Sequence, residues 1–434
     1  MRGWSAEQVA DAAGARLVEP GTRTSGPTRA VIDSRHAGPG DLFVGLPGER
    51  VDGGRFAEDV LGAGAWGVLV GEGWAGADTQ DGGAILVATD PLAALQRLAT
   101  AWRRELGAKV IGVTGSTGKT STKDLLAAMV DQQRRVVATP LNLNTEIGLP
   151  LTVLSAPAGT EVLVLELAMR GAGQIAELAA IAEPDVGVIV NVGPVHLELL
   201  GSVEAIAATK AELLVGLAPG GTAVVPAGEP LLEPHLGLRE DVSTVTFGPG
   251  GDVDALPEAL ELRVGGRLSA HMRVNALAAL AAARAVGVEP TGPLEVALSE
   301  LRGDRITFPD GSVVVNDCYN ANPMSMRAAL DDLAASASGR RVAVLGDMRE
   351  LGPEERRFHE EIGAHARAAG VDLLVTVGPL AAAMGPAFGG TTHAVGTAAE
   401  AAALLPSLMR AGDTVLVKAS RGVGLEVVAQ GLTA

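Results

Sequence analysis

Residues 112–121 read Gly112-Val113-Thr114-Gly115-Ser116-Thr117-Gly118-Lys119-Thr120-Ser121. An apolar run from Val110 precedes this stretch, and a helical pattern from Thr122 to Met129 follows it. This order, in which a strand leads into a glycine-rich turn with Lys-Thr and then a helix, is typical of a loop whose backbone N–H groups surround a polyphosphate. Lys119 is expected to reach the outer phosphates and Thr120 to ligate Mg²⁺. The alternative is an ordinary glycine-rich turn with a solvated lysine, because the strict consensus asks for glycine where Val113 stands.

The composition limits the class of protein. The chain has 434 residues, of which 47% are hydrophobic, and this predicts a globular protein of about three domains. The net charge of −17 argues against nucleic acid or an anionic membrane as the main partner. One cysteine, Cys318, excludes an internal disulfide and fits a reducing compartment, and the N-terminus lacks an apolar signal segment. We therefore expect a cytoplasmic protein, acting as a monomer, with no nucleic-acid partner and no membrane insertion.

The alternation of predicted strands and helices indicates an α/β protein of three domains. We expect a smaller N-terminal α/β domain in residues 1–83, with a linker at 81–83. Residues 84–301 are expected to form a central P-loop-type parallel sheet with helices on both faces, closed by a helix from Asn275 to Val286. Residues 302–434 are expected to form a C-terminal Rossmann-like doubly wound sheet.

Two polar side chains follow predicted central strands. Glu166 ends an apolar run, and His196 comes shortly after the next one. Because ligands gather at the carboxyl ends of parallel strands, both side chains should face the crevice of the phosphate loop. Together with Thr120 they can complete a site for a hard divalent cation. The alternatives are a helix-capping carboxylate for Glu166 and a satisfied turn histidine for His196.

Lysine is scarce in this chain. Five of the 34 basic residues are lysines, so each is a candidate for a role that arginine cannot fill. Lys109 and Lys123 flank the phosphate loop and are expected to be surface charges. Lys210 lies among alanines in the middle of a predicted helix. It is either a snorkelling surface cation or a lysine carboxylated to a carbamate, a modification that arginine cannot take.

The predicted third domain opens with Arg305 and then Asp317-Cys318-Tyr319-Asn320. An arginine across a cleft can neutralise charge on a transferring phosphoryl group. Asp317 can hold a ribose hydroxyl or a metal-bound water, and Tyr319 can cover a base. The alternative is an ordinary strand-to-helix turn that starts a helix at Asn322-Pro323.

The order of these motifs resembles that of the Mur ligases of peptidoglycan synthesis, over essentially the whole chain. The motifs are Thr114–Thr120, Asn142–Gly148, Glu166–Met169, His196, Lys210, Asn275–Ala279, Arg305 and Asp317–Pro323. Others are similar to the branch of the family that joins D-Ala-D-Ala to UDP-MurNAc-tripeptide, namely Tyr319–Pro323, Leu345–Met348 with Glu350–Gly352, and Lys418–Gly422. The resemblance implies an ATP-dependent amide-bond ligase that forms UDP-MurNAc-pentapeptide through an acyl phosphate.

The resemblance also implies where the substrates lie. The N-terminal domain would hold the UDP-sugar near Ser34 and Arg35. The muramoyl-peptide would face Asn142, Asn144 and Thr145. Lys418 and Arg421 would help to receive D-Ala-D-Ala or its product. ATP would be bound by Gly115, Ser116, Thr117, Gly118, Lys119, Thr120, Ser121, Asn275, Arg305, Asp317, Tyr319 and Asn320.

The implied catalytic residues are Lys119, Glu166, His196, Lys210 and Arg305. By resemblance, Thr120, Glu166 and His196 would hold Mg²⁺, and Lys210 matches a position that is carboxylated in several Mur ligases, where it would join the metal site. Asn275 would contact the adenine. The third domain is expected to close over the bound nucleotide.

The sequence departs from the family at two places. His271 is followed by Met272 where the family usually has asparagine, and the stretch from Gly228 to Ala270 is short. Two other readings stay open. One is a related ligase, which adds the third amino acid of the peptide or extends a folate with glutamate. The other is an ATP-gated binding protein without ligase activity.

Overall fold

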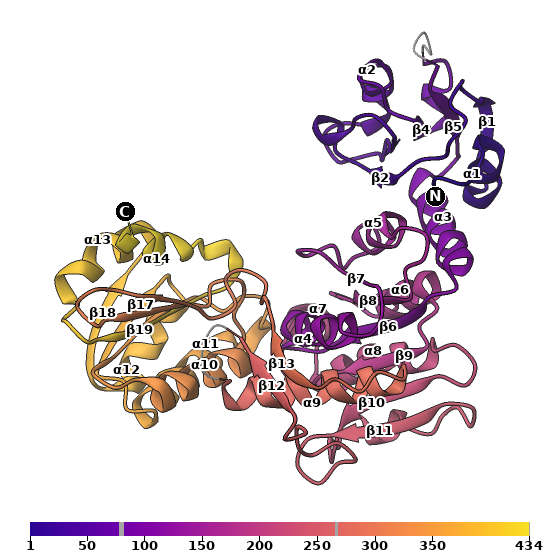
Figure 1. Ribbon diagram of the computed structural model, residues 1–434. Helices are drawn as coiled ribbons and strands as arrows, with labels where there is room; N and C mark the ends of the chain where they lie inside the picture. Colours follow the sequence, from indigo (N-terminus) through magenta and orange to yellow (C-terminus); the bar gives the residue numbers. More distant parts are fainter. Residues whose placement is uncertain (78–81, 265–267, 434) are drawn as a thin grey trace.

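The computed structural model describes residues 1–77, 82–264 and 268–433, and each of its three large sheets has helices packed against it (Figure 1). The N-terminal sheet stands above the central sheet in this view, and the C-terminal sheet lies to the left. The predicted α/β class with three domains is therefore confirmed. The predicted linker begins at Asp81, which lies outside the described residues.

The N-terminal sheet has the strand order β1-β5-β4-β3-β2, with β1 antiparallel at the edge. Its strands are β1 (Arg16–Glu19), β2 (Arg29–Val31), β3 (Asp41–Val44), β4 (Gly67–Val70) and β5 (Ala84–Val87), and its helices are α1 (Ala6–Ala13) and α2 (Ala57–Gly62). The expected boundary at residue 83 is too early, because β5 pairs with both β1 and β4.

A pair of aromatic rings fixes the N-terminal domain to the central one. Trp4, just before α1, meets Trp102 of α3 (Pro91–Leu106) edge to face, with ring centroids 5.3 Å apart. Ser5 and Gln8 form a capping box that starts α1, and Pro91 occupies the first turn of α3. The side chain of Arg97 in α3 donates to the carbonyl of Ala13 at 2.8 Å. The orientation of the first domain is therefore set by packing and not only by the linker.

The central sheet is wholly parallel, in the order β11-β10-β9-β6-β8-β7. Its strands are β6 (Lys109–Thr114), β7 (Val136–Ala138), β8 (Val162–Glu166), β9 (Val186–Ile189), β10 (Thr222–Pro226) and β11 (Ser243–Phe247). One face packs with α3, α5 (Gly148–Ser155), α6 (Gln174–Ala182) and α8 (Val203–Val215). The other packs with α4 (Lys119–Asp131) and α9 (Ala270–Ala285). Such double coverage requires the apolar strands seen in the sequence.

Two local expectations for the central domain are wrong. The helix expected from Asn275 begins at Ala270, because the Ser269 hydroxyl caps it by accepting from the Met272 N–H. Lys123 is not a surface charge: it is 4% exposed, and its amine donates to the Thr139 carbonyl at 2.9 Å.

The C-terminal sheet has the order β14-β15-β19-β16-β17-β18, parallel except for β14. Its strands are β14 (Asp304–Thr307), β15 (Val313–Asn316), β16 (Arg341–Gly346), β17 (Leu373–Val377), β18 (Thr391–Val395) and β19 (Thr414–Lys418). Helices α10 (Pro323–Ser336), α11 (Glu355–Ala368) and α12 (Met384–Phe388) cover one face, and α13 (Ala398–Leu408) and α14 (Glu426–Thr433) the other. The expected doubly wound arrangement is present.

Short elements complete the chain. They are α7 (Leu197–Leu200) and the paired strands β12 (Leu260–Arg263) and β13 (Gly292–Glu295). The stretch 228–270 therefore retains strands β11 and β12. Among the described residues, no helix combines the length and apolar character needed to cross a bilayer.

Candidate active site

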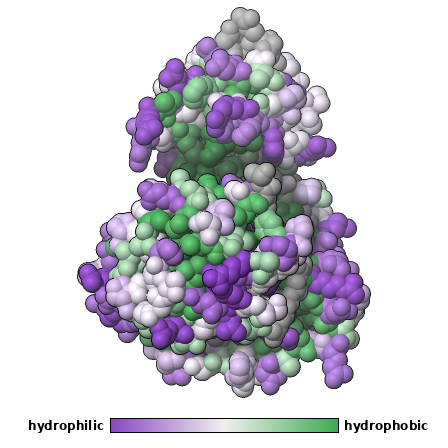
Figure 2. Space-filling model, turned by 90° about the vertical axis from the view of Figure 1, so that its left-hand side faces the viewer, coloured by the Kyte–Doolittle hydropathy of each residue, from purple (hydrophilic) through white to green (hydrophobic). Residues whose placement is uncertain are grey.

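A cavity of about 1180 Å³ opens at the carboxyl ends of the central strands. Its walls come from the phosphate loop, from the segment 142–146, from the start of α9 and from the third domain. The waist in Figure 2, with hydrophobic residues on both sides, separates the N-terminal domain from the rest, whereas the residues that line the cavity belong to the central and C-terminal domains. The cavity thus lies where segments far apart in sequence meet.

The phosphate loop is held by an asparagine outside it. The Asn191 Oδ1 atom accepts from the N–H groups of Ser116 and Thr117 at 3.1 and 2.9 Å. Gly118 has a φ of +75°, and a Cβ there would lie 2.6 Å from Oδ1 of Asn275, so the position needs glycine. Asn275 lies beside the loop. Asn191 was not predicted as a site residue, although it is one of the few asparagines and ends an apolar run.

Thr120 and Glu166 form a buried polar pair. The Thr120 hydroxyl donates to Glu166 Oε2 at 2.8 Å, and the Asn144 amide donates to Oε1 at 2.8 Å. Glu166 is 2% exposed, so its carboxylate depends on these donors. The Lys119 amine donates to the Gly115 carbonyl at 2.8 Å, and burial lowers the pKa of Lys119. The sequence predicted that Thr120 and Glu166 meet, and the structure brings them together.

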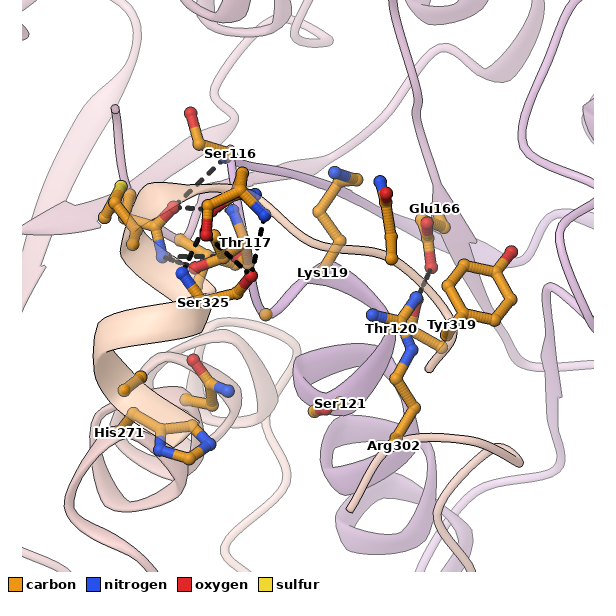
Figure 3. Close-up of a pocket in the computed structure, with 18 of the residues that line it drawn as sticks. Ser116, Thr117, Lys119, Thr120, Ser121, Glu166, His271, Arg302, Tyr319 and Ser325 are labelled. Atoms are coloured by element: carbon orange, nitrogen blue, oxygen red, sulfur yellow. Dashed lines mark hydrogen bonds between the residues drawn. The ribbon is translucent and has the colours of Figure 1, made fainter. Parts of the chain in front are cut away.

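Arg302 reaches this pair from the third domain. Its guanidinium donates to the Thr120 hydroxyl at 3.0 Å and lies over the Tyr319 ring, 3.9 Å from the centroid. Figure 3 shows Arg302 between Thr120 and Tyr319, with Glu166 on the far side of Thr120. Arg305, the arginine expected here, also lines the cavity but pairs with Ser336 at 3.1 Å and with Asp332 at 3.6 Å. Sequence analysis missed Arg302, because nothing in its local pattern separates it from Arg305.

His196 lines the same cavity but contacts the third domain. Its Nδ1 lies 2.5 Å from Oε2 of Glu350. Burial lowers the pKa of His196, although Glu350 acts in the opposite direction. In the described part of the chain, no group of three or more His, Cys, Asp and Glu side chains could hold a metal ion. Thr120 and Glu166 offer adjacent oxygen atoms, the donors that Mg²⁺ prefers while it keeps water and phosphate oxygens as further ligands, and His196 lines the same cavity.

Lys210 is buried, so the surface-cation interpretation is wrong. The residue is 2% exposed, and no hydrogen bond joins its amine to another residue within 1–77, 82–264 or 268–433. Burial, and then the nearby charge of Lys119, hold the pKa of Lys210 well below its usual range. Burial therefore favours the neutral form of this amine, which is the form that reacts with CO₂.

Lys418 supports a loop of the third domain. Its amine donates to the Asp317 carboxylate at 2.6 Å and to the Asn320 carbonyl at 2.9 Å. All three residues line the cavity, whereas Arg421 does not line it and lies 3.6 Å from Glu426. The geometry gives Lys418 a positioning contact within the loop, and its role in receiving D-Ala-D-Ala or its product stays a prediction.

The predicted substrate residues are split between two places. Asn142, Asn144 and Thr145 line the cavity. Ser34 and Arg35 lie in a short 3-10 helical turn of the N-terminal domain and do not line it. The Arg35 guanidinium is paired with Asp33 at 2.6 Å, an exposed contact.

The Met272 departure lies in the lining of the cavity. Its sulfur lies 3.8 Å from the amide nitrogen of Asn275. The neighbouring His271 contacts Ser269 at 3.0 Å and lines the cavity. Burial lowers the pKa of His271. The asparagine that the family usually has here is thus replaced by a thioether that packs beside Asn275.

Comparison with known proteins finds similar sequences over most of the chain. The Mur ligase middle domain matches residues 113–276, and the Mur ligase, glutamate ligase domain matches residues 302–421. The chain is 37% identical to "UDP-N-acetylmuramoyl-tripeptide--D-alanyl-D-alanine ligase" of Bacillus subtilis (strain 168), covering 92% of each chain. The corresponding Escherichia coli (strain K12) protein is 32% identical, again over 92% of each.

Solved structures of related proteins are also similar to this chain in fold. A crystal structure of MurF from Acinetobacter baumannii has a TM-score of 0.85 and 30% identity, covering 99% of this chain and 98% of that one. MurF ligase from Thermotoga maritima, solved in complex with ADP, has a TM-score of 0.78 and 30% identity, covering 93% of this chain and 96% of that one. E. coli FolC, at 19% identity and a TM-score of 0.57, covering 77% of this chain and 93% of that one, shares the fold alone. With relatives this similar over nearly its full length, the chain belongs to the Mur ligase family.

Proposed function

We propose that this protein is an ATP-dependent, ADP-forming ligase that joins D-Ala-D-Ala to UDP-MurNAc-tripeptide. The product is UDP-MurNAc-pentapeptide, a precursor of peptidoglycan. The observation that carries the proposal is the similarity, over 92% of the chain, to relatives with this activity in their name. The cavity supports it, because a phosphate loop, a peptide-facing segment and a third-domain loop open into one space.

The reaction follows from these parts. A carboxylate oxygen of the tripeptide attacks the γ-phosphorus of ATP, the bond to ADP breaks, and an acyl phosphate forms. The dipeptide amine then attacks the acyl carbon, loses a proton, and phosphate leaves. Lys119 and the loop N–H groups would bear the charge that develops on the phosphoryl oxygens. Asn142, Asn144 and Thr145 would hold the peptide end in line for the first step.

Mg²⁺ would be held by Thr120 and Glu166, with His196 on the adjoining wall. When bound, it neutralises charge on the phosphates. We propose further that Lys210 is carboxylated. Its buried amine, which lacks a hydrogen-bond partner among the described residues, supports this, because a carbamate would offer negative charge beside Lys119.

The remaining assignments are consistent with this role. Asn275, Asp317, Tyr319 and Asn320 would surround the nucleoside, and Arg305 would approach the phosphates when the third domain closes. Ser34 and Arg35 would meet the UDP group, and Arg421 the incoming dipeptide. We propose a cytoplasmic location, which the single cysteine supports. The monomeric state and the start of the third domain at residue 302 stay predictions.

An acceptor screen tests the proposal. The enzyme is given ATP and one of three carboxylate substrates, UDP-MurNAc-tripeptide, UDP-MurNAc-dipeptide or a folate. Each is combined with D-Ala-D-Ala, with a single amino acid or with no acceptor, and phosphate release is measured. We expect release that depends on D-Ala-D-Ala. Release with a single amino acid and UDP-MurNAc-dipeptide would favour a ligase that adds the third residue, glutamylation of a folate would favour the other ligase, and release without any acceptor would favour the ATP-gated binding protein.

A further inference from the structure

One motif of the C-terminal domain has no part in the mechanism above. It runs from Leu345 to Met348 at the end of β16 and continues through Glu350-Leu351-Gly352. Its loop crosses from the third domain to α7 of the central domain. The Glu350 carboxylate ends 2.5 Å from Nδ1 of His196.

The contact belongs to a small interface. The N–H of Glu198 in α7 donates to the Glu350 carbonyl at 3.4 Å. Gly352 packs so closely that a Cβ there would lie 3.3 Å from the Glu198 backbone. Leu197, next to His196, packs against the hydrophobic cores of both domains. The side chain of His196 therefore sits at a seam that both domains build.

The loop is anchored on both sides of Glu350. Met348 and Leu351 are buried at 0% and 1% exposure, and the Met348 N–H donates to Nε2 of His359 at 2.9 Å. His359 in turn donates from Nδ1 to the Glu355 carbonyl at 2.6 Å. Glu350 lies between these anchors, so its backbone is held next to His196 while its side chain stays 42% exposed.

The backbone at the contact is unusual. Glu350 has a φ of +63° and His196 a φ of +53°. Residues other than glycine rarely adopt this left-handed conformation, which persists where the surroundings hold it. Each partner of the pair therefore has an uncommon backbone conformation that the packing around it must hold.

We propose that Glu350 is a positioning residue for His196. Its carboxylate accepts the Nδ1–H of the imidazole, so the proton stays on Nδ1 and the Nε2 lone pair is left free as a ligand. An outer carboxylate that orients a ligating histidine in this way is a common arrangement at metal sites. Because Glu350 comes from the third domain, the orientation of His196 depends on how that domain is docked. The inference rests on the proposed function only for the identity of the ligand, a metal–nucleotide complex.

The first test needs no ligand and no turnover. The ring nitrogens of His196 are observed by ¹⁵N NMR in the nucleotide-free enzyme and assigned with His196→Gln. The variants are Glu350→Ala, Glu350→Gln, whose amide oxygen can still accept from Nδ1, and the control Glu360→Gln, an exposed carboxylate paired with Arg356 on α11. We expect one tautomer, with the proton on Nδ1, in all except Glu350→Ala. An unchanged His196 spectrum in Glu350→Ala would overturn the proposal.

A second test uses Mn²⁺ with ADP as the probe, with binding followed by electron paramagnetic resonance. Loss of an outer partner of a ligand typically weakens metal binding about 10- to 100-fold. We expect this loss in Glu350→Ala and near-normal affinity in Glu350→Gln and Glu360→Gln. Equal losses in Glu350→Ala and Glu350→Gln would show that only charge matters and would contradict a positioning role. If the acceptor screen failed while the His196 spectrum still changed, the proposed function would be wrong but the positioning contact would stand.

Discussion

The two walls of the cavity are built in different ways. On the central wall, Thr120, Glu166 and Asn191 follow neighbouring strands of one sheet, so its register alone brings them together. On the other wall, Arg302 and Glu350 reach across from the third domain. The first wall keeps its geometry wherever the third domain lies, while the second exists only when the two domains are docked. The central wall should therefore govern nucleotide binding and the stabilisation of charge. The wall that the third domain supplies, the docked wall, should govern the timing of the reaction, that is, when the site is complete and the reaction can start.

The largest expected effect is on the central wall. Lys119→Ala should lower kcat roughly 100- to 1,000-fold, the usual cost of losing one preorganised charge contact in the transition state. The fold should remain, which a circular dichroism spectrum and melting curve can check. Lys109→Ala is the matched control, because that lysine is exposed and pairs with Asp185. Near-normal turnover in a folded Lys119→Ala enzyme would contradict the assignment of the phosphate-binding loop.

Lys210 comes next. Lys210→Ala should lose about 100-fold in kcat if a carbamate supplies negative charge, and acetate should restore part of it by filling the space. Lys210→Arg should stay inactive, although arginine keeps the positive charge. Lys119→Ala serves as the control that acetate should not rescue. An active Lys210→Arg enzyme would exclude the carbamate and leave the ligase assignment standing.

Arg305 tests the timing role of the docked wall. Arg305→Ala should lower kcat about tenfold or more, since this charge would reach the phosphoryl group only in the closed enzyme. The KM for UDP-MurNAc-tripeptide should hardly change, because Arg305 lies away from Ser34 and Arg35. Arg356→Ala, an exposed arginine on α11, is the control. A change confined to the KM of the UDP substrate would be inconsistent with cleft closure.

The smallest effect concerns the anchor of the Glu350 loop. Burial lowers the pKa of His359 below that of a histidine in the unfolded chain, so the folded protein favours the neutral ring. The stabilisation is complete above about pH 6.5 and falls as the pH drops below it, because the unfolded state then binds more protons. We expect the free energy of unfolding, measured with urea, to fall by roughly 1 kcal/mol for each unit by which the pKa of His359 differs between the folded and unfolded states. His359→Gln should reduce this loss of stability at low pH. An unchanged loss would show that other groups cause it.

The sequence predicted the central wall well because its motifs are local. A phosphate loop and a carboxylate at the end of the next parallel strand have fixed places in such a sheet, so the pairing of Thr120 with Glu166 follows from their positions in the chain. The α/β class and the doubly wound third domain followed from the same periodicity. The first boundary was placed too early, because a strand near the junction of two domains, such as β5, shows which sheet it joins only through its partners.

The docked wall could not be predicted in the same way. Arg302 and Arg305 are three residues apart, and only the packing of the third domain against the central one shows that Arg302 meets Thr120. Glu350 and His196 are 154 residues apart and meet only through domain packing. The burial of Lys123 was missed because one lysine beside a phosphate loop has the same local pattern whether it is exposed or bonded to a carbonyl.

The central claim is that the tripeptide carboxylate is phosphorylated before the dipeptide attacks. It is tested most directly with UDP-MurNAc-tripeptide carrying ¹⁸O in its terminal carboxylate, incubated with ATP, Mg²⁺ and D-Ala-D-Ala. The account predicts one ¹⁸O atom in each phosphate released, in step with pentapeptide formation, because the oxygen that attacks phosphorus leaves with it. Phosphate without ¹⁸O, or phosphate released without the dipeptide, would contradict it.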